Sequence, residues 1–124
     1  METKTARIAA LATLQRVEVE GYKADATLNR FLCSLRGGDR EKALARELCY
    51  GVLRWRLKLD HVLSQFYNGD LEKLTPWIRN ILRLGVYQLL FLHRVPPWAA
   101  LNESVKLAHR YGHKGTAGLV NGIL

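Results

Sequence analysis

Apolar residues recur every three or four positions along most of the chain, and Gly, Pro and Asp residues separate the resulting blocks. This spacing is typical of amphipathic α-helices, whereas no segment alternates apolar and polar residues for long enough to predict a β-strand. We therefore expect an all-α domain of six or seven helices. The predicted helices cover approximately residues 5–20, 28–35, 39–67, 76–92, 99–111 and 116–124.

The longest predicted helix, residues 39–67, has apolar residues on two sides. One side holds Leu48, Val52, Trp55, Leu59, Val62 and Phe66, and the other holds Tyr50, Leu53 and Leu57. Because a surface helix needs only one apolar face, we expect this helix to be central, with Trp55 fully enclosed. Arg54, Arg56 and Lys58 lie on the margins between the two sides, where long side chains cover apolar surface and keep their charges in water.

The start of the helix at residues 76–92 has a clear signal. Thr75 can cap the free N–H groups of the first turn, and Pro76 at the first helical position lacks an N–H that would be unsatisfied. Two large rings, Trp77 and Trp98, follow helix-start prolines. We expect both rings to close the core, with an exposed protein-docking patch as the alternative for Trp98.

The net charge favours a polyanionic partner. The 124 residues include 19 Lys and Arg against 11 Asp and Glu, a net charge of +8. The excess is even, since residues 1–62 hold 12 basic and 8 acidic residues and residues 63–124 hold 7 and 3. Nucleic acid is a better candidate than a membrane for such a surface, and a basic but inert surface is the alternative.

The remaining chemistry-bearing residues predict neither a metal site nor export. Cys33 and Cys49 have no neighbouring ligand at metal-site spacing, so we expect free, buried thiols in a reducing cytoplasm. His109 and His113 lack a third ligand. The apolar run that begins at Leu84 is much shorter than the roughly 18 residues of a membrane span, so we expect a cytoplasmic protein without membrane contact.

Three separated blocks carry a family resemblance: "ARELCYGVLRWRLKLDHVL", "RNILRLGVYQLLFLHRVPPWAALNESVKLA" and "KGTAGLVNGIL". In this order and spacing they resemble the NusB-like helical domain, most closely the N-terminal domain of RsmB-type (Sun/Fmu) ribosomal RNA cytosine-5 methyltransferases. The resemblance implies two packed three-helix units and an RNA-binding role for residues 1–124. It also implies that the natural chain continues into a catalytic methyltransferase domain.

The chemistry of that methyltransferase family needs a cysteine nucleophile after Pro or Thr and an S-adenosylmethionine site at the end of a strand. Here Leu32 precedes Cys33 and Leu48 precedes Cys49, and the helical pattern offers no such strand. We therefore expect no catalytic residue and no cofactor in this chain, whose partner would be ribosomal RNA. Two alternatives remain: a transcription antitermination factor that binds RNA with a ribosomal protein, and a helical scaffold for another protein.

The candidate RNA-binding residues are Lys4, Arg7, Arg79, Arg83 and Tyr87. Lys4 and Arg7 match the family's basic N-terminal region, and free N–H groups at a helix start also favour phosphate. Arg79, Arg83 and Tyr87 share a polar sector of the helix at residues 76–92, where charges and a ring would suit single-stranded RNA. An ordinary solvated face is the alternative for this sector.

Arg83 has a second interpretation of equal weight. It lies beside a strongly apolar helix face, and the family blocks place it near Glu47 and Glu103. An internal ion pair with one of these carboxylates would then hold Arg83 in place of an RNA contact.

Overall fold

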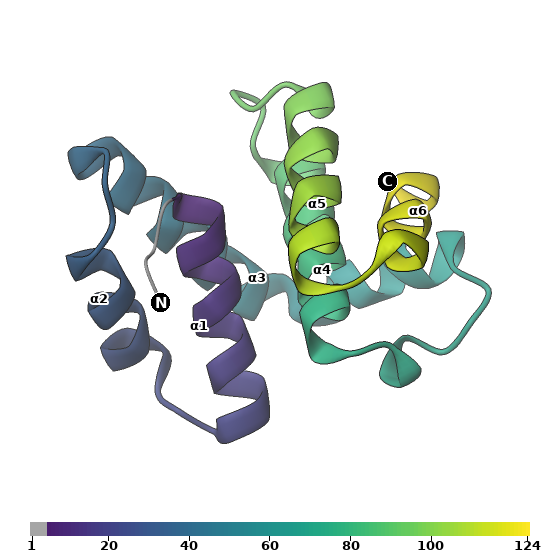
Figure 1. Cartoon of the computed structure of the whole chain (residues 1–124), viewed down its shortest axis with the longest axis horizontal. Coiled ribbons are helices and arrows are strands. Elements are labelled where there is room, and N and C mark those ends of the chain that lie inside the picture. Colours follow the sequence, from purple (N-terminus) through teal and green to yellow (C-terminus); the bar gives the residue numbers. More distant parts are fainter. Residues whose placement is uncertain (1–4) are drawn as a thin grey trace. The chain divides into compact units, whose positions relative to one another are not determined.

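The computed structural model describes residues 5–124, which contain six α-helices, one short 3₁₀ helix and no β-strand (Figure 1). The α-helices are α1 (Ala6–Glu20), α2 (Ala24–Cys33), α3 (Gly38–Phe66), α4 (Pro76–Phe91), α5 (Pro97–Tyr111) and α6 (Lys114–Ile123), and the 3₁₀ helix η1 is Leu71–Lys73. The all-α prediction is confirmed, and each predicted helix is present with ends shifted by a few residues. None of the helices in this range is long and apolar enough to cross a lipid bilayer.

The chain divides between Arg54 and Trp55, within α3, into two compact units. The first unit contains α1, α2 and the start of α3, and the second contains the end of α3 with η1, α4, α5 and α6. The boundary coincides with a kink, because the backbone of Trp55 leaves the helical region at φ −104° and ψ 16°. Two units were expected, but they share one helix instead of holding three complete helices each.

In the first unit, local signals set both ends of α1. The Thr5 hydroxyl oxygen accepts a hydrogen bond from the N–H of Ile8 at 3.2 Å, and Gly21 ends the helix in the left-handed conformation at φ 70°. Such a conformation is easily reached by glycine. Ala6, Ala9 and Ala10 are fully buried, and α1 and α2 pack alongside each other (Figure 1).

The predicted two-sided burial of α3 is only half correct. On the larger side, Leu48 and Leu59 are fully buried, but Trp55 is 36% exposed and Phe66 is 68% exposed. On the opposite side, Leu57 is 80% exposed. Full enclosure of Trp55 and a second buried face were therefore wrong predictions, and α3 has one buried stripe that is interrupted at its kink.

In the second unit, α4 is buried on all sides. Every residue from Ile78 to Gln88 is buried, including the polar ones. Thr75 caps the helix by accepting from the N–H of Ile78 at 3.4 Å, and Pro76 occupies the first turn, as predicted. A helix that is buried all round must satisfy its polar side chains within the protein.

The helices α5 and α6 complete the second unit, and both pack against α4. The side chain of His113 accepts from the N–H of Gly115 at 3.1 Å, while Thr116 accepts from the N–H of His113 at 2.8 Å, so α6 begins two residues before the predicted start. Trp77 stacks on Tyr111 with 4.5 Å between ring centroids, as expected for a ring that closes the core. Trp98 is 68% exposed, so the same expectation was wrong for it.

The two cysteines differ in accessibility. Cys49 is buried on α3, and its burial, with a smaller contribution from the charge of Asp25, raises the pKa of its thiol to about 12. Cys33 is exposed at the end of α2, so the prediction that both thiols are buried was wrong for Cys33. Only a thiolate reacts readily with electrophiles, so the two sites should differ strongly in reactivity.

We expect N-ethylmaleimide to modify one thiol of the native protein at neutral pH, and mass spectrometry of peptides to place it at Cys33. Cys49 should react only after unfolding, because an unfolded thiol ionises near pH 8.5. The folded state favours the neutral Cys49 thiol, so its stabilising contribution is complete below that pH and decreases as the pH rises towards 12. Rapid modification of a Cys33→Ser variant would contradict the assignment.

Candidate nucleic-acid interface

The polar sector predicted on α4 does not form a surface. Arg79, Arg83 and Tyr87 are only 7%, 3% and 7% exposed. The sector is therefore neither the predicted RNA-binding row nor the alternative solvated face. Each of the three side chains has an internal structural role.

Arg79 binds the backbone of the segment that precedes α4, residues 71–74. Its Nη1 donates hydrogen bonds to three backbone carbonyl oxygens, those of Leu74 at 2.8 Å, Leu71 at 3.3 Å and Glu72 at 3.4 Å. These carbonyls belong to η1 and the residue that follows it. A guanidinium with several donors in one plane suits such a cluster of acceptors.

We expect Arg79→Met to lower the free energy of unfolding by about 1.5 kcal/mol, the lower part of the range for hydrogen bonds to a charged group, because water can reach the partly exposed carbonyls. The slope of RNA affinity against salt should stay unchanged. Urea denaturation and RNA titrations would measure the two quantities. Lys73→Met, which removes an equal charge from an exposed position of η1, is the matched control.

Arg83 forms an internal ion pair, but with a carboxylate that sequence reasoning did not name. Its Nε and Nη2 donate to the two carboxylate oxygens of Asp60 at 2.7 and 2.9 Å, and its Nη1 donates to Asn80 Oδ1 at 3.1 Å. Glu103 instead pairs with Lys106 at 3.6 Å, so the predicted pair of Arg83 with Glu103 was wrong. Pairing with Glu47 stays a prediction.

Tyr87 belongs to a stack of three rings in the second unit. It stacks on Phe91 with centroids 5.1 Å apart, and Phe91 stacks on Trp55 at 5.3 Å. The ammonium group of Lys58 lies 5.8 Å from the Trp55 ring and 5.9 Å from the Phe91 ring. Offset aromatic stacking stabilises packing beyond the area it buries, so Tyr87 supports the unit from within.

The N-terminal candidates lie at the start of α1. Lys4 is outside the described residues, and Arg7 is half-buried in the first helical turn. Two N–H groups of this turn already have acceptors, because Glu41 Oε1 accepts from Ala6 at 2.8 Å and Thr5 accepts from Ile8 at 3.2 Å. The free N–H groups expected to favour phosphate are therefore fewer than predicted, and RNA contact by Lys4 and Arg7 stays a prediction.

A basic hollow between α1 and α2 was missed by sequence reasoning. It has a volume of about 80 Å³ and is lined by Arg16, Thr27, Arg30 and Phe31. The guanidinium of Arg16 lies 5.6 Å from the centroid of the Phe31 ring. Arg16 and Arg30 belong to different helices, so their proximity follows from the antiparallel α1–α2 packing and not from a sequence motif.

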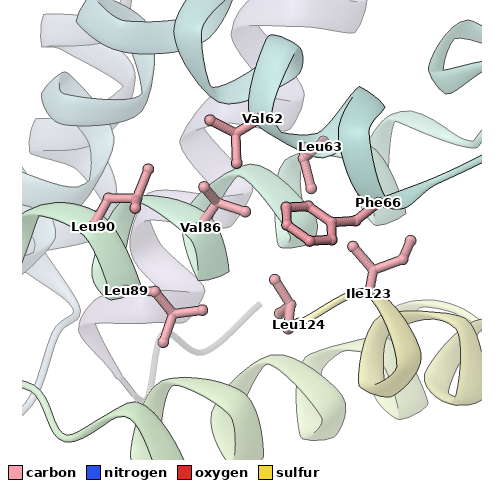
Figure 2. Close-up of a pocket in the computed structure, with 8 residues that line it drawn as sticks. All are labelled: Val62, Leu63, Phe66, Val86, Leu89, Leu90, Ile123 and Leu124. Atoms are coloured by element: carbon pink, nitrogen blue, oxygen red, sulfur yellow. The ribbon is translucent and has the colours of Figure 1, made fainter.

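A second hollow, in the unit formed by residues 55–124, is apolar (Figure 2). Its volume is about 200 Å³, and its lining residues are Val62, Leu63, Phe66, Val86, Leu89, Leu90, Ile123 and Leu124. Gly85 lets the end of the chain approach α4, because a Cβ there would lie 2.5 Å from Leu124 Cδ1. This lining contains no group that could bind a phosphate.

Within residues 5–124, no three His, Cys, Asp or Glu side chains gather at a spacing that could hold a metal ion.

Comparison with known proteins assigns a family. The sequence pattern of the NusB family matches residues 4–124. The chain belongs to the NusB family. The solved structure of T. maritima NusB has the same fold, with a TM-score of 0.86. The two sequences are 28% identical, and the match covers 95% of this chain and 84% of the T. maritima chain.

The curated relatives of the chain include two kinds of protein. The chain is 36% identical over 124 residues to the probable ribosomal RNA small subunit methyltransferase B of Bacillus subtilis, covering 100% of this chain and 28% of the methyltransferase. It is 32% identical over 125 residues to the transcription antitermination protein NusB of Bacillus velezensis, covering 100% of this chain and 93% of that protein. The chain thus spans less than a third of the methyltransferase relative and nearly all of the antitermination relative.

Proposed function

We propose that this chain is a non-catalytic RNA-binding domain that assists the methylation of cytosine in small-subunit ribosomal RNA. The observation that carries the proposal is the 36% identity, over the whole chain, to a ribosomal RNA small subunit methyltransferase. The net charge of +8 supports binding to a polyanion. In this proposal, the catalytic domain occupies the part of the natural protein outside these residues.

The chain's own thiols support placing catalysis elsewhere. A cytosine-5 methyltransferase attacks its base with a thiolate, whereas Cys49 is buried with a pKa of about 12 and Cys33 ends a surface helix. S-adenosylmethionine binds at the carboxyl end of a strand in the methyltransferase fold, and residues 5–124 contain no strand. The described residues therefore do not fit this cofactor.

Fluorescence anisotropy with a labelled single-stranded fragment of small-subunit ribosomal RNA tests the binding role. We expect micromolar affinity that decreases steeply with salt, with a log–log slope of about −0.7 for each neutralised phosphate. The same affinity at every salt concentration would reject a charge-driven RNA role and favour a protein-docking scaffold. Stoichiometric binding of S-adenosylmethionine in calorimetry would contradict the non-catalytic assignment.

Transcription antitermination is the second candidate, favoured by the 32% identity that extends over 93% of an antitermination protein. In that case the chain would bind RNA together with a ribosomal protein. Deleting the gene separates the two roles. Loss of a 5-methylcytosine from small-subunit ribosomal RNA, measured by bisulfite sequencing, would support the methylation role. Intact methylation with early termination in ribosomal RNA operons would support antitermination.

A further inference from the structure

The basic hollow of the first unit combines two arginines that have little internal compensation. Among residues 5–124, the one carboxylate that pairs with Arg16 is Glu20, at 3.9 Å, and both side chains are nearly half exposed, so this surface pair contributes little. Arg30 is exposed, and no acidic or hydrogen-bonding partner for it exists among the described residues. The hollow therefore presents two guanidinium groups whose donors are largely available.

Phe31 holds one of these groups in place. Its half-buried ring lies 5.6 Å from the Arg16 guanidinium carbon, a distance at which a cation is attracted to the face of a ring. This contact restricts the long Arg16 side chain before any ligand arrives. Restricting a side chain in advance reduces the entropy lost on binding.

The chemistry of the lining favours a phosphate over a base. Guanidinium groups match the oxygens of a phosphate with paired, charge-assisted hydrogen bonds. The guanidinium of Arg16 already lies over one face of the Phe31 ring, so a base could not stack on that face without displacing Arg16. A volume of about 80 Å³ also suits a compact tetrahedral group better than a purine or pyrimidine ring with its sugar.

We propose that the hollow lined by Arg16, Thr27, Arg30 and Phe31 binds one backbone phosphate of single-stranded RNA. This inference rests on the proposed RNA-binding function and gives it a site that differs from the N-terminal residues of α1. Arg16 and Arg30 contact the same phosphate from two helices. The site fixes the position of the RNA strand and reads no base, because phosphate contacts carry no sequence information.

The test uses the whole chain, labelled single-stranded RNA and a salt series. We expect Arg16→Gln and Arg30→Gln each to weaken binding about tenfold, as for loss of one charge-assisted hydrogen bond. The double variant should reduce the magnitude of the log–log slope by about 0.7, the value for a single phosphate. Phe31→Leu should weaken binding and leave the slope unchanged, because it frees Arg16 without removing a charge.

The control is the double variant Arg40→Gln/Arg46→Gln, which removes the same charge from exposed positions of α3 in the same unit. It should lose less affinity than the Arg16/Arg30 double variant. Equal losses would overturn the phosphate site, because the effect would then come from overall charge, while RNA binding itself would stand. A slope change of about 1.4 would indicate two separate phosphates and would also overturn it. Absence of RNA binding by the wild-type chain would reject both proposals.

Discussion

Leu59→Ala should lower the free energy of unfolding by about 3 kcal/mol, within the range for large-to-small substitutions in a core. Leu59 is fully buried on α3, so the removal of three carbon atoms reduces the buried apolar area and leaves a cavity. Leu57, two residues earlier on the same helix, is 80% exposed. The same substitution there, Leu57→Ala, should change stability by no more than about 0.5 kcal/mol.

Urea denaturation followed by circular dichroism would measure both variants, and each serves as the control for the other. They share residue type, helix and substitution, so helix propensity cancels between them. Similar losses for both would mean that α3 buries two faces after all, as its sequence pattern predicted. Little loss for Leu59→Ala would mean that the buried stripe is misplaced.

Asp60→Asn should destabilise the protein by about 2 kcal/mol, below the usual cost of breaking a buried ion pair. The cost arises because the Arg83 side chain is only 4% exposed and loses a charged acceptor bound through two nitrogens. The loss of stability is smaller than for a fully buried pair because the Asp60 side chain is 25% exposed and Asn80 still accepts a hydrogen bond from Arg83.

The matched control is Glu72→Gln, which neutralises an exposed carboxylate of the same unit. It should leave the melting temperature nearly unchanged. If Asp60→Asn behaved like this control, the ion pair would contribute nothing to stability, and the explanation for the burial of Arg83 would be wrong.

The sequence was sufficient to predict the helices because their signals are local. Thr5 and Thr75 cap two helices that were predicted to begin at or next to these residues, and Gly21 ends α1. A cap involves residues within one turn, so its partners are visible in the spacing. The kink at Trp55 has no such local signal, because neither Pro nor Gly lies next to it in the sequence, and it was therefore missed.

The internal partners of α4 could not be predicted in the same way. Arg79 and Arg83 looked like a surface row because their own helix offers no acidic side chain. Their acceptors lie elsewhere: backbone carbonyls around η1 for Arg79, and Asp60, 23 residues away, for Arg83. Likewise, Arg16 and Arg30 converge only through the packing of two helices. Helical periodicity locates a polar residue on a face but does not determine what covers that face.

The pairs of helices that pack most extensively are close neighbours in the sequence: α1 with α2, α4 with α5, and α5 with α6. Contacts between sequence neighbours give a low contact order, and helical proteins of this type fold in microseconds to milliseconds. During synthesis, domains form from the N-terminus onward as the chain emerges. The α1–α2 pair, which carries the basic hollow, is therefore complete in the nascent chain before the ribosome has synthesised α4.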